Sequence, residues 1–223
     1  MAGLLITFEG LDLSGKSSVL WKIIRDLIEE GFEIHTYREP GGTEIGDQIR
    51  DVVHSMKNHE IHPRTELLLY QASRAQLVNE VLRPGLEEGK IFIGDRFSDS
   101  TRAYQGGGRG IDMNEINSLI EFATGGLTPD LTILFDIPVE IRKERITKGR
   151  EWNRMDIQDI PFYQAVREKY LQLASENVDG RWRVIDATQP LDEVVESVKT
   201  IVRDKIETHL SVEGQQKRGK ETW

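Results

Sequence analysis

One glycine-rich segment constrains the fold of this chain more than any other feature, because it fits the pattern G-x-x-x-x-G-K-[ST]. With the serine that follows it, the segment comprises Gly10, Leu11, Asp12, Leu13, Ser14, Gly15, Lys16, Ser17 and Ser18. It lies directly after an apolar run at residues 4–9 and opens a helical pattern at about 16–30. Such glycines let backbone N–H groups turn toward phosphate oxygens, and the helix N-terminus adds the positive end of its dipole. The segment therefore predicts an ATP-binding phosphate loop, with Lys16 on the β- and γ-phosphates and the Ser17 hydroxyl on Mg²⁺.

Short apolar runs alternate with longer helical patterns along the whole chain. The runs predict strands at 4–9, 32–37, 91–94, 131–135 and 182–185. The helical patterns lie at about 16–30, 43–56, 64–88, 112–123, 138–148, 161–177 and 190–209. Several strands are apolar on both faces, which is typical of parallel sheets covered by helices on both sides. We therefore expect a three-layer α/β fold of the phosphate-loop type, with a five-stranded parallel sheet in one domain over residues 1–209. Residues 210–223 lose the apolar periodicity and are expected to form a flexible tail.

Composition excludes several classes of protein. The chain has 29 Lys and Arg against 38 Asp and Glu, a net charge of −9, which disfavours coating of nucleic acid. A cleft can still be locally positive and bind small anions. Cysteine is absent, which excludes disulfides and thiolate chemistry, and no run approaches the roughly 18 apolar residues of a membrane span. These features predict a cytoplasmic protein whose partners are neither nucleic acid nor membrane.

The phosphate loop alone fits GTPases, motor ATPases and kinases of small molecules. The sequence contains no Asn-Lys pair, so it lacks the Asn-Lys-x-Asp motif with which GTPases read their base. Asp12 inside the loop is informative, because a carboxylate beside phosphates is unfavourable unless it serves Mg²⁺ or a substrate hydroxyl. A loop-capping aspartate that bonds its own backbone is the alternative, and both interpretations stay open.

Polar residues follow the second and third predicted strands, where parallel sheets bind ligands. Arg38 and Pro40 belong to the segment REPGGT, and the Arg38 guanidinium suits bidentate contact with phosphate. Asp95 ends the third strand at the position where phosphate-loop proteins hold Mg²⁺, and Arg96 can screen two phosphates brought close together. For Arg38 alone, a solvated charge beside a turn is the favoured interpretation.

Two further groups favour a pocket for a nucleobase. Tyr70 and Arg74 lie four residues apart on the predicted helix 64–88, so they share a face and can stack on a base and bond its edge. A run of polar side chains before a flexible glycine segment suits a wall that reads base or sugar, namely Ser100, Thr101, Tyr104 and Gln105. A tyrosine at helical spacing is more often a core residue, and a capped helix with a glycine-rich exit loop would also explain the second group.

Basic residues crowd one stretch of this acidic chain: Arg142, Lys143, Arg145, Lys148, Arg150 and Arg154. A solvated basic helix end explains the first four, since cations complement the helix dipole there. Arg150 and Arg154 are kept as candidate catalytic cations on a lid at about 149–158, because mobile arginines can close over a phosphoryl group.

Taken together, six segments resemble the bacterial type of the thymidylate kinase family in order and spacing, over about residues 4–205. They are FEGLDLSGKSS, REPGGT, ELLLYQASRAQ, DRFSDSTRAYQGGGRG, PDLTILFD and REWNRMD with the FYQAVREKYLQLA that follows. The resemblance implies that Arg38 and Arg96 hold the phosphate of the nucleoside monophosphate. It implies that Tyr70 stacks on thymine, that Arg74 reads the thymine edge, and that Asp12 contacts the sugar 3′-hydroxyl and the Mg²⁺ region.

The same resemblance implies an activity, the ATP- and Mg²⁺-dependent phosphorylation of dTMP to dTDP for dTTP synthesis, by a homodimer. The implied catalytic residues are Asp12, Lys16, Arg96, Arg150 and Arg154, since a loop without arginine belongs to the subgroup that supplies arginine from the lid. The chain departs from the family pattern at Leu13, in the lid sequence Asn-Arg-Met-Asp, and at Arg102, which stands close to the predicted base pocket. A kinase of another nucleoside monophosphate and a non-catalytic nucleotide-binding module are the alternatives.

Overall fold

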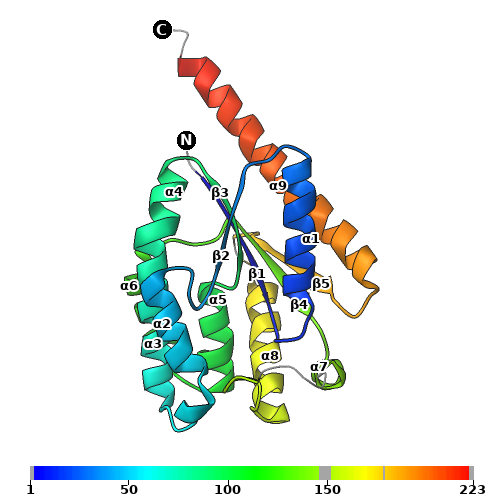
Figure 1. Cartoon of the computed structure of the whole chain (residues 1–223). Helices are drawn as coiled ribbons and strands as arrows, with labels where there is room; N and C mark the ends of the chain where they lie inside the picture. Colours follow the sequence, from blue (N-terminus) through cyan, green and yellow to red (C-terminus); the bar gives the residue numbers. More distant parts are fainter. Residues whose placement is uncertain (1–2, 146–151, 178, 221–223) are drawn as a thin grey trace.

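The computed structural model describes residues 3–145, 152–177 and 179–220. Within these ranges the centre of the molecule is a five-stranded sheet in which all neighbouring strands are parallel. The strands are β1 (Leu4–Gly10), β2 (Ile34–Arg38), β3 (Ile91–Asp95), β4 (Leu131–Asp136) and β5 (Trp182–Asp186). Their order is β2-β3-β1-β4-β5, so β1 lies in the middle (Figure 1). The predicted α/β fold with a five-stranded parallel sheet is confirmed.

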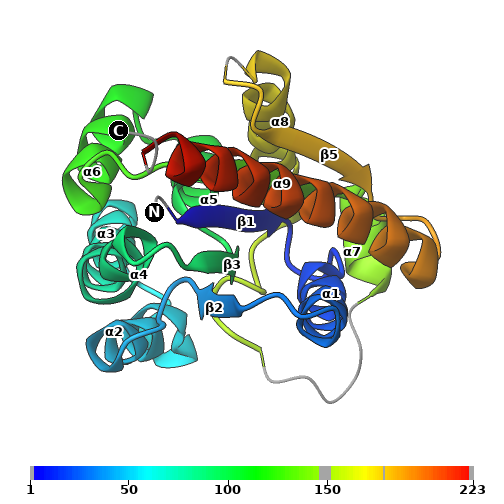
Figure 2. The same ribbon diagram turned by 90° about the horizontal axis from the view of Figure 1, so that it is seen from above.

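Helices cover both faces of this sheet (Figures 1 and 2). They are α1 (Lys16–Glu29), α2 (Glu44–His54), the short η1 (Met56–Asn58), α3 (Pro63–Leu77), the π-helical η2 (Val78–Leu82), α4 (Arg83–Glu87), α5 (Ser98–Thr101), the π-helical η3 (Arg102–Gly108), α6 (Met113–Thr124), α7 (Val139–Glu144), α8 (Ile160–Glu176) and α9 (Leu191–Lys220). The single helix predicted at 64–88 is thus the continuous segment α3–η2–α4. In the part of the chain that is described, no helix combines the length and the apolar character needed to cross a bilayer.

The central strand shows why the sequence folds this way. Every residue of β1 is buried, and alternate side chains point to opposite faces of the sheet. Leu4 and Ile6 pack in the core cluster with Ile23 of α1 and Val202 of α9, and Figure 2 shows α9 lying along β1. Leu5 joins the cluster formed with α3 and η2 instead. Each such side chain contributes roughly 1.5–3 kcal/mol on burial, so a strand that is apolar on both faces requires both helical layers.

The glycine run after Gln105 differs from the predicted flexible exit segment. It lies inside η3, which packs closely against α8. A Cβ atom at Gly107 would lie 2.7 Å from the carbonyl oxygen of Ala165, and one at Gly108 would lie 2.4 Å from the Phe162 ring. These glycines therefore allow two helices to approach each other and hold the polar side chains before them in place.

The C-terminal helix also differs from prediction. The helix expected at 190–209 continues in the structure as α9 to Lys220, whereas the flexibility expected of residues 210–223 stays a prediction, and residues 221–223 lie outside the described residues. Glu, Gln, Lys and Arg are good helix formers, so a helix that is already packed on the sheet can extend beyond its last apolar turn.

Candidate active site

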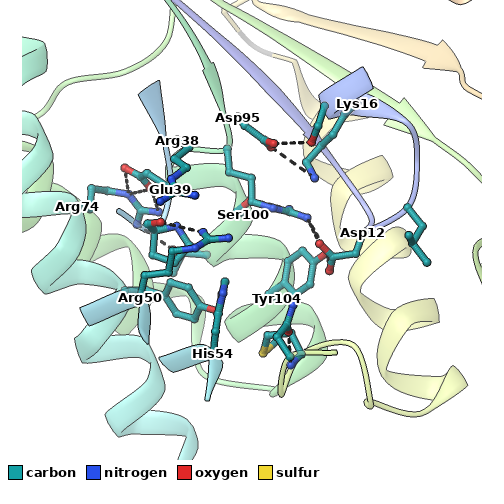
Figure 3. Close-up of a pocket in the computed structure, with 18 of the residues that line it drawn as sticks. Asp12, Lys16, Arg38, Glu39, Arg50, His54, Arg74, Asp95, Ser100 and Tyr104 are labelled. Atoms are coloured by element: carbon teal, nitrogen blue, oxygen red, sulfur yellow. Dashed lines mark hydrogen bonds and ion pairs between the residues drawn. The ribbon is translucent and has the colours of Figure 1, made fainter. Parts of the chain in front are cut away.

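A cavity of about 370 Å³ opens at the carboxyl ends of β1, β2 and β3 (Figure 3). The predicted site residues that line it are Asp12, Leu13, Gly15, Lys16, Ser17, Ser18, Arg38, Pro40, Tyr70, Arg74, Asp95, Arg96, Ser100, Thr101, Tyr104 and Gln105. Five residues without a predicted role complete the wall: Glu39, Arg50, His54, Asn153 and Met155. Figure 3 shows Asp12 and Lys16 on one side of the cavity and Arg38, Arg50 and Arg74 on the other.

The phosphate loop joins β1 to α1 with a strained backbone. Gly10 has φ of 141°, and a Cβ atom there would lie 2.6 Å from the carbonyl oxygen of Phe135, so only glycine fits. Leu13 has φ of 69°, a left-handed conformation that costs a non-glycine residue about 1–2 kcal/mol. The departure from the family pattern at Leu13 therefore places a residue with a side chain in a left-handed conformation. Three predicted loop residues do not line the cavity: Gly10, Leu11 and Ser14.

Lys16 and Ser17, at the start of α1, both contact Asp95 at the end of β3. The Lys16 Nζ atom lies 3.4 Å from Asp95 Oδ1, and the Ser17 hydroxyl donates to Asp95 Oδ2 at 2.7 Å. Burial opposes ionisation of Asp95, but the charges of Lys16 and Arg96 hold its pKa below the usual value. Asp95 Oδ1 is buried and has no hydrogen-bond partner among the residues that the structure describes. A hydroxyl and an ionised carboxylate side by side are hard oxygen donors of the kind that Mg²⁺ prefers.

Arg96 links the end of β3 to the phosphate loop. Its guanidinium donates to Asp12 Oδ1 at 2.8 Å and to the hydroxyl of Tyr104 at 3.2 Å, and it lies 4.9 Å from the centre of the Tyr104 ring. Tyr104 in turn donates to Asp12 Oδ2 at 3.0 Å. Burial raises the pKa of Asp12, but the Arg96 and Lys16 charges outweigh it and hold the pKa well below its usual range. The Asp12 carboxylate thus contacts Arg96 and Tyr104 across the cavity, rather than acting as a simple cap of its own loop.

Two more arginines add positive charge to the opposite wall. Arg38 ends β2, lines the cavity and donates to Asp47 Oδ1 at 3.0 Å. Arg50 of α2 lies beside it and donates to the carbonyl oxygen of Pro40 at 2.9 Å. Arg50 was not predicted, although its place on the helix that follows REPGGT was a usable signal. The cavity is therefore locally positive on an acidic protein, which suits anionic ligands.

Arg74 is buried in the cavity wall with its donors engaged. Its guanidinium pairs with Glu39 through Nε at 2.9 Å and also through Nη2. The remaining donors reach the Gln71 side chain, the Thr101 hydroxyl and the Phe97 carbonyl oxygen. Burial raises the pKa of Glu39 against the lowering effect of Arg74. Reading of a base edge by Arg74 stays a prediction, and it requires the bond to Gln71 or Thr101 to be exchanged for one to the ligand.

Tyr70 and Gln105 complete the predicted base wall. Burial raises the pKa of Tyr70, so the phenol is neutral where it faces the cavity. The Gln105 side-chain amide donates to Glu66 Oε1 at 2.8 Å. Glu66 does not line the cavity, so this bond holds the amide from outside the cavity wall. The aromatic face and the polar groups predicted from separate segments are thus brought to one cavity.

His54, the last residue of α2, is a lining residue that sequence reasoning missed. Burial, reinforced by the Arg50 charge, lowers its pKa from 6.5 to about 4. The unfolded chain therefore protonates His54 at a higher pH than the folded protein does, so this contribution to stability is present above pH 6.5 and lost as the pH falls toward 4.

We expect His54→Gln to remove this pH dependence. Relative to the wild type, the variant should gain up to about 3 kcal/mol in free energy of unfolding between pH 7 and pH 4. Chemical denaturation of both proteins at several pH values measures the difference, in which the other titrating groups cancel. A stability difference independent of pH would contradict the assigned environment of His54.

Only one of the two predicted lid arginines lies among the described residues. Arg150 lies outside the described residues, whereas Arg154 is buried and does not line the cavity. Arg154 Nη2 lies 2.6 Å from Glu66 Oε2, and its Nε donates to the carbonyl oxygen of Val53 at 3.0 Å. The neighbours Asn153 and Met155 do reach the cavity wall. In this arrangement Arg154 is an ion-pair partner of α3 and not a cation in the cavity.

Two basic residues of the stretch before the lid are not the solvated charges that were predicted. Arg142 is buried, with its guanidinium 3.5 Å from the centre of the Tyr163 ring. Arg145 donates to the carbonyl oxygens of Leu13 at 3.2 Å and Ser14 at 3.0 Å, so it holds the phosphate loop from outside. Lys143 is exposed as predicted, and Lys148 lies outside the described residues.

In the sequence Arg102 stands close to the predicted base pocket, but in the structure it lies outside the pocket wall. It does not line the cavity, and its guanidinium donates to Asp99 and Asn117 at 2.9 Å each. It follows Thr101 into η3, where the helix turns its side chain away from the cavity toward α6.

Comparison with known proteins agrees with this geometry. The family model described as thymidylate kinase matches residues 8–198. The chain is 42% identical to a thymidylate kinase of Leuconostoc mesenteroides subsp. mesenteroides, over 91% of this chain and 96% of that protein. The matched range contains the residues that line the cavity. The chain belongs to the thymidylate kinase family.

Proposed function

We propose that this chain transfers the γ-phosphoryl group of ATP to dTMP, giving ADP and dTDP for dTTP synthesis. The proposal rests on one observation, which is that the phosphate loop contacts the residues at the end of β3. Asp95 pairs with Lys16 of the phosphate loop, and the next residue, Arg96, bonds Asp12 of the same loop. A triphosphate on the loop and a monophosphate held by Arg96 and Arg38 would meet at this point. Membership of the thymidylate kinase family supports dTMP as the acceptor.

The chemistry requires positioning and charge more than covalent catalysis. The acceptor oxygen belongs to a phosphate that is already anionic, so no side chain has to remove a proton. Negative charge moves over the oxygens of the migrating group, and cations fixed beforehand stabilise it without reorganising. Lys16 and Arg96 are fixed in this way by Asp95 and Asp12.

Mg²⁺ fits the oxygen donors beside the loop. The Ser17 hydroxyl and the Asp95 carboxylate would hold it, together with phosphate oxygens and water. Among the described residues no group of three or more acidic or histidine side chains could enclose a metal, which suits an ion that arrives with its nucleotide. When bound, the ion neutralises charge on the β- and γ-phosphates.

We also propose that residues 149–158 act as a lid that brings Arg154, and Arg150 with it, to the phosphates. Arg154 has to leave Glu66 for this, and Glu66 keeps the Arg109 guanidinium and the Gln105 amide as partners. Arg154 can thus leave this ion pair without leaving the Glu66 carboxylate unpartnered.

Selectivity for the base should follow the hydrogen-bonding pattern of its edge. Thymine presents the O4 acceptor where cytosine presents an amino donor, and Arg74 has donors only. A donor facing a donor leaves both unsatisfied, at roughly 1–3 kcal/mol each. We expect catalytic efficiency for dTMP and dUMP to exceed that for dCMP by at least about tenfold. Competition assays with dTMP, dUMP, dCMP and dGMP measure this preference, and a preference for dCMP or dGMP would contradict it.

The proposed activity is tested by a coupled assay that detects ADP with ATP and dTMP as substrates. Turnover with dTMP supports the proposal, and turnover only with another nucleoside monophosphate would assign a different kinase of the same class. ATP binding without turnover of any monophosphate would identify a non-catalytic nucleotide-binding module.

Homodimer formation and a cytoplasmic location are parts of the same proposal. Exposed apolar side chains lie on α2, α3 and α6, which share one side of the molecule in Figure 1: Ile45, Val52, Leu68 and Phe122. A second copy covering this side would remove Phe122, which is 88% exposed, from water. The chain has no cysteine, so its fold has no disulfide that would require an oxidising compartment.

A further inference from the structure

Glu9, the residue before the phosphate loop, carries a carboxylate that the proposed chemistry does not use. Its side chain is fully buried near the end of β1. Oε1 accepts the backbone N–H groups of Phe97 at 2.8 Å and Ser100 at 3.3 Å. Oε2 accepts the hydroxyl of Ser100 at 2.5 Å and that of Tyr170, from α8, at 2.7 Å. Among the described residues, no lysine or arginine donates directly to this carboxylate.

Burial of such a group in a protein core lowers the free energy of unfolding. The pKa of Glu9 is raised to about 7, chiefly by burial and also by the nearby Asp99, against the lowering effects of Arg96, Ser100 and Tyr170. A buried carboxylate without a bonded cation destabilises the fold relative to an apolar residue of similar size. Groups of this kind concentrate at functional sites.

Both hydroxyls that bond Glu9 also bond Arg96. Arg96 Nη1 donates to the Ser100 hydroxyl at 3.0 Å and to the Tyr170 hydroxyl at 3.2 Å. A hydroxyl that gives its proton to Glu9 turns its lone pairs toward another donor. Glu9 thereby orients the two oxygens that accept from one side of the Arg96 guanidinium, while Asp12 accepts from the other side.

Glu9 also holds the backbone at Arg96. This residue has φ of 75°, a left-handed conformation that costs about 1–2 kcal/mol in a residue with a side chain. The Phe97 N–H group that bonds Glu9 belongs to the peptide directly after Arg96, and Ser100 lies one turn further on. The carboxylate therefore fixes both the strained backbone and, through two hydroxyls, the guanidinium.

We propose that Glu9 is a positioning residue for phosphoryl transfer, which sets the spacing between the phosphate loop and Arg96. Glu9 directly precedes Gly10 of the loop, so one side chain joins the element that binds ATP to the arginine that holds the acceptor phosphate. The inference rests on the proposed function, because Arg96 has this role only if a monophosphate is the acceptor.

The test compares Glu9→Gln with Thr7→Val in the full chain. Glutamine keeps the shape but replaces one acceptor oxygen with a donor, so two of the four bonds are either lost, at the backbone N–H groups, or reversed in direction, at the two hydroxyls. We expect kcat/KM for dTMP to fall about tenfold or more, with KM for ATP within about twofold of the wild type. Thr7 lies two residues earlier on the same face of β1, and its buried bond to the Thr132 hydroxyl does not reach the cavity. Thr7→Val should therefore leave both constants within about twofold, even where it lowers the thermal midpoint.

A double-mutant cycle separates positioning from a general structural role. In an Arg96→Ala background, Glu9→Gln should cause less than about a twofold further loss, because Glu9 acts through Arg96. A full further loss of about tenfold in that background would overturn the proposal. Unchanged kinetics in Glu9→Gln would do the same.

Tyr170→Phe and Ser100→Ala extend the test should Glu9→Gln not fold. Each removes one hydroxyl between Glu9 and Arg96, and each should lower kcat/KM for dTMP while KM for ATP stays near the wild-type value. Wild-type kinetics in both variants would overturn the positioning role. A wild-type protein that does not phosphorylate dTMP would overturn the proposed function instead, so the two failures are distinguishable.

Discussion

Lys16→Ala is expected to lower kcat by on the order of 10²–10³ while the protein stays folded. Lys16 Nζ lies 3.4 Å from Asp95 Oδ1 and faces the cavity, where it would lie on the β- and γ-phosphates. Its side chain is buried, and a cation in a buried site stabilises the transition state far more than one at the surface. Alanine removes that charge and leaves Asp95 with Ser17 and the neighbouring Arg96.

Steady-state kinetics with ATP and dTMP measure the loss, and thermal denaturation shows that the variant is folded. Lys22→Ala is a matched control, because Lys22 lies on the same helix and, within the described part of the chain, pairs only with the exposed Asp192 at 3.1 Å. The control should keep wild-type kinetics, since an exposed ion pair contributes little. Activity close to that of the wild type in a folded Lys16→Ala protein would refute the assignment of the phosphate loop.

The fold could be predicted because its signals are local and mutually consistent. Strand β1 is apolar on both faces, the phosphate loop follows it at once, and α1 begins at Lys16. Each of these features depends on neighbours in the sequence, and together they fix a parallel sheet with helices on both sides. The glycine run in η3 was misread because close packing against α8 depends on residues more than fifty positions away, which no local pattern shows.

The sequence predicted which residues belong to the site better than it predicted which residues they contact. Arg38, Asp95 and Arg96 follow strand ends, so topology alone sends them to one edge of the sheet. The Glu39 partner of Arg74 lies 35 residues earlier in the chain, and only the folded arrangement of β2 and α3 shows that the pair is buried together.

Ion pairs and buried acids were the least predictable features. Arg154 pairs with Glu66 of α3 across a long separation in sequence, and a basic stretch gives no sign of which arginine will be buried. Glu9 is a single acidic residue at the end of an apolar strand, and its importance depends on hydroxyls from α5 and α8 that meet it in space. Burial decides the role of such groups, and burial is a property of the whole fold.

Arg96→Ala is expected to lower kcat/KM for dTMP by on the order of 10²–10³, with a much smaller effect on KM for ATP. The guanidinium donates to Asp12, Ser100, Tyr104 and Tyr170, which fixes it at the junction between the loop and the acceptor site. Arg96→Lys should recover little of the loss, because an ammonium keeps the charge but cannot present a planar fork of donors to all these partners. Arg102→Ala is the matched control from the same segment, since Arg102 bonds Asp99 and Asn117 and does not line the cavity.

Arg96→Gly distinguishes lost catalysis from lost folding. At φ of 75° glycine is unstrained, so this variant should be more stable than Arg96→Ala by about 1 kcal/mol. Both variants lack the guanidinium, so both should lose the same activity despite their different free energies of unfolding. Activity that follows stability across alanine, glycine and lysine would mean that Arg96 matters for the fold alone. Activity that follows the presence of the guanidinium assigns it to the transfer of the phosphoryl group.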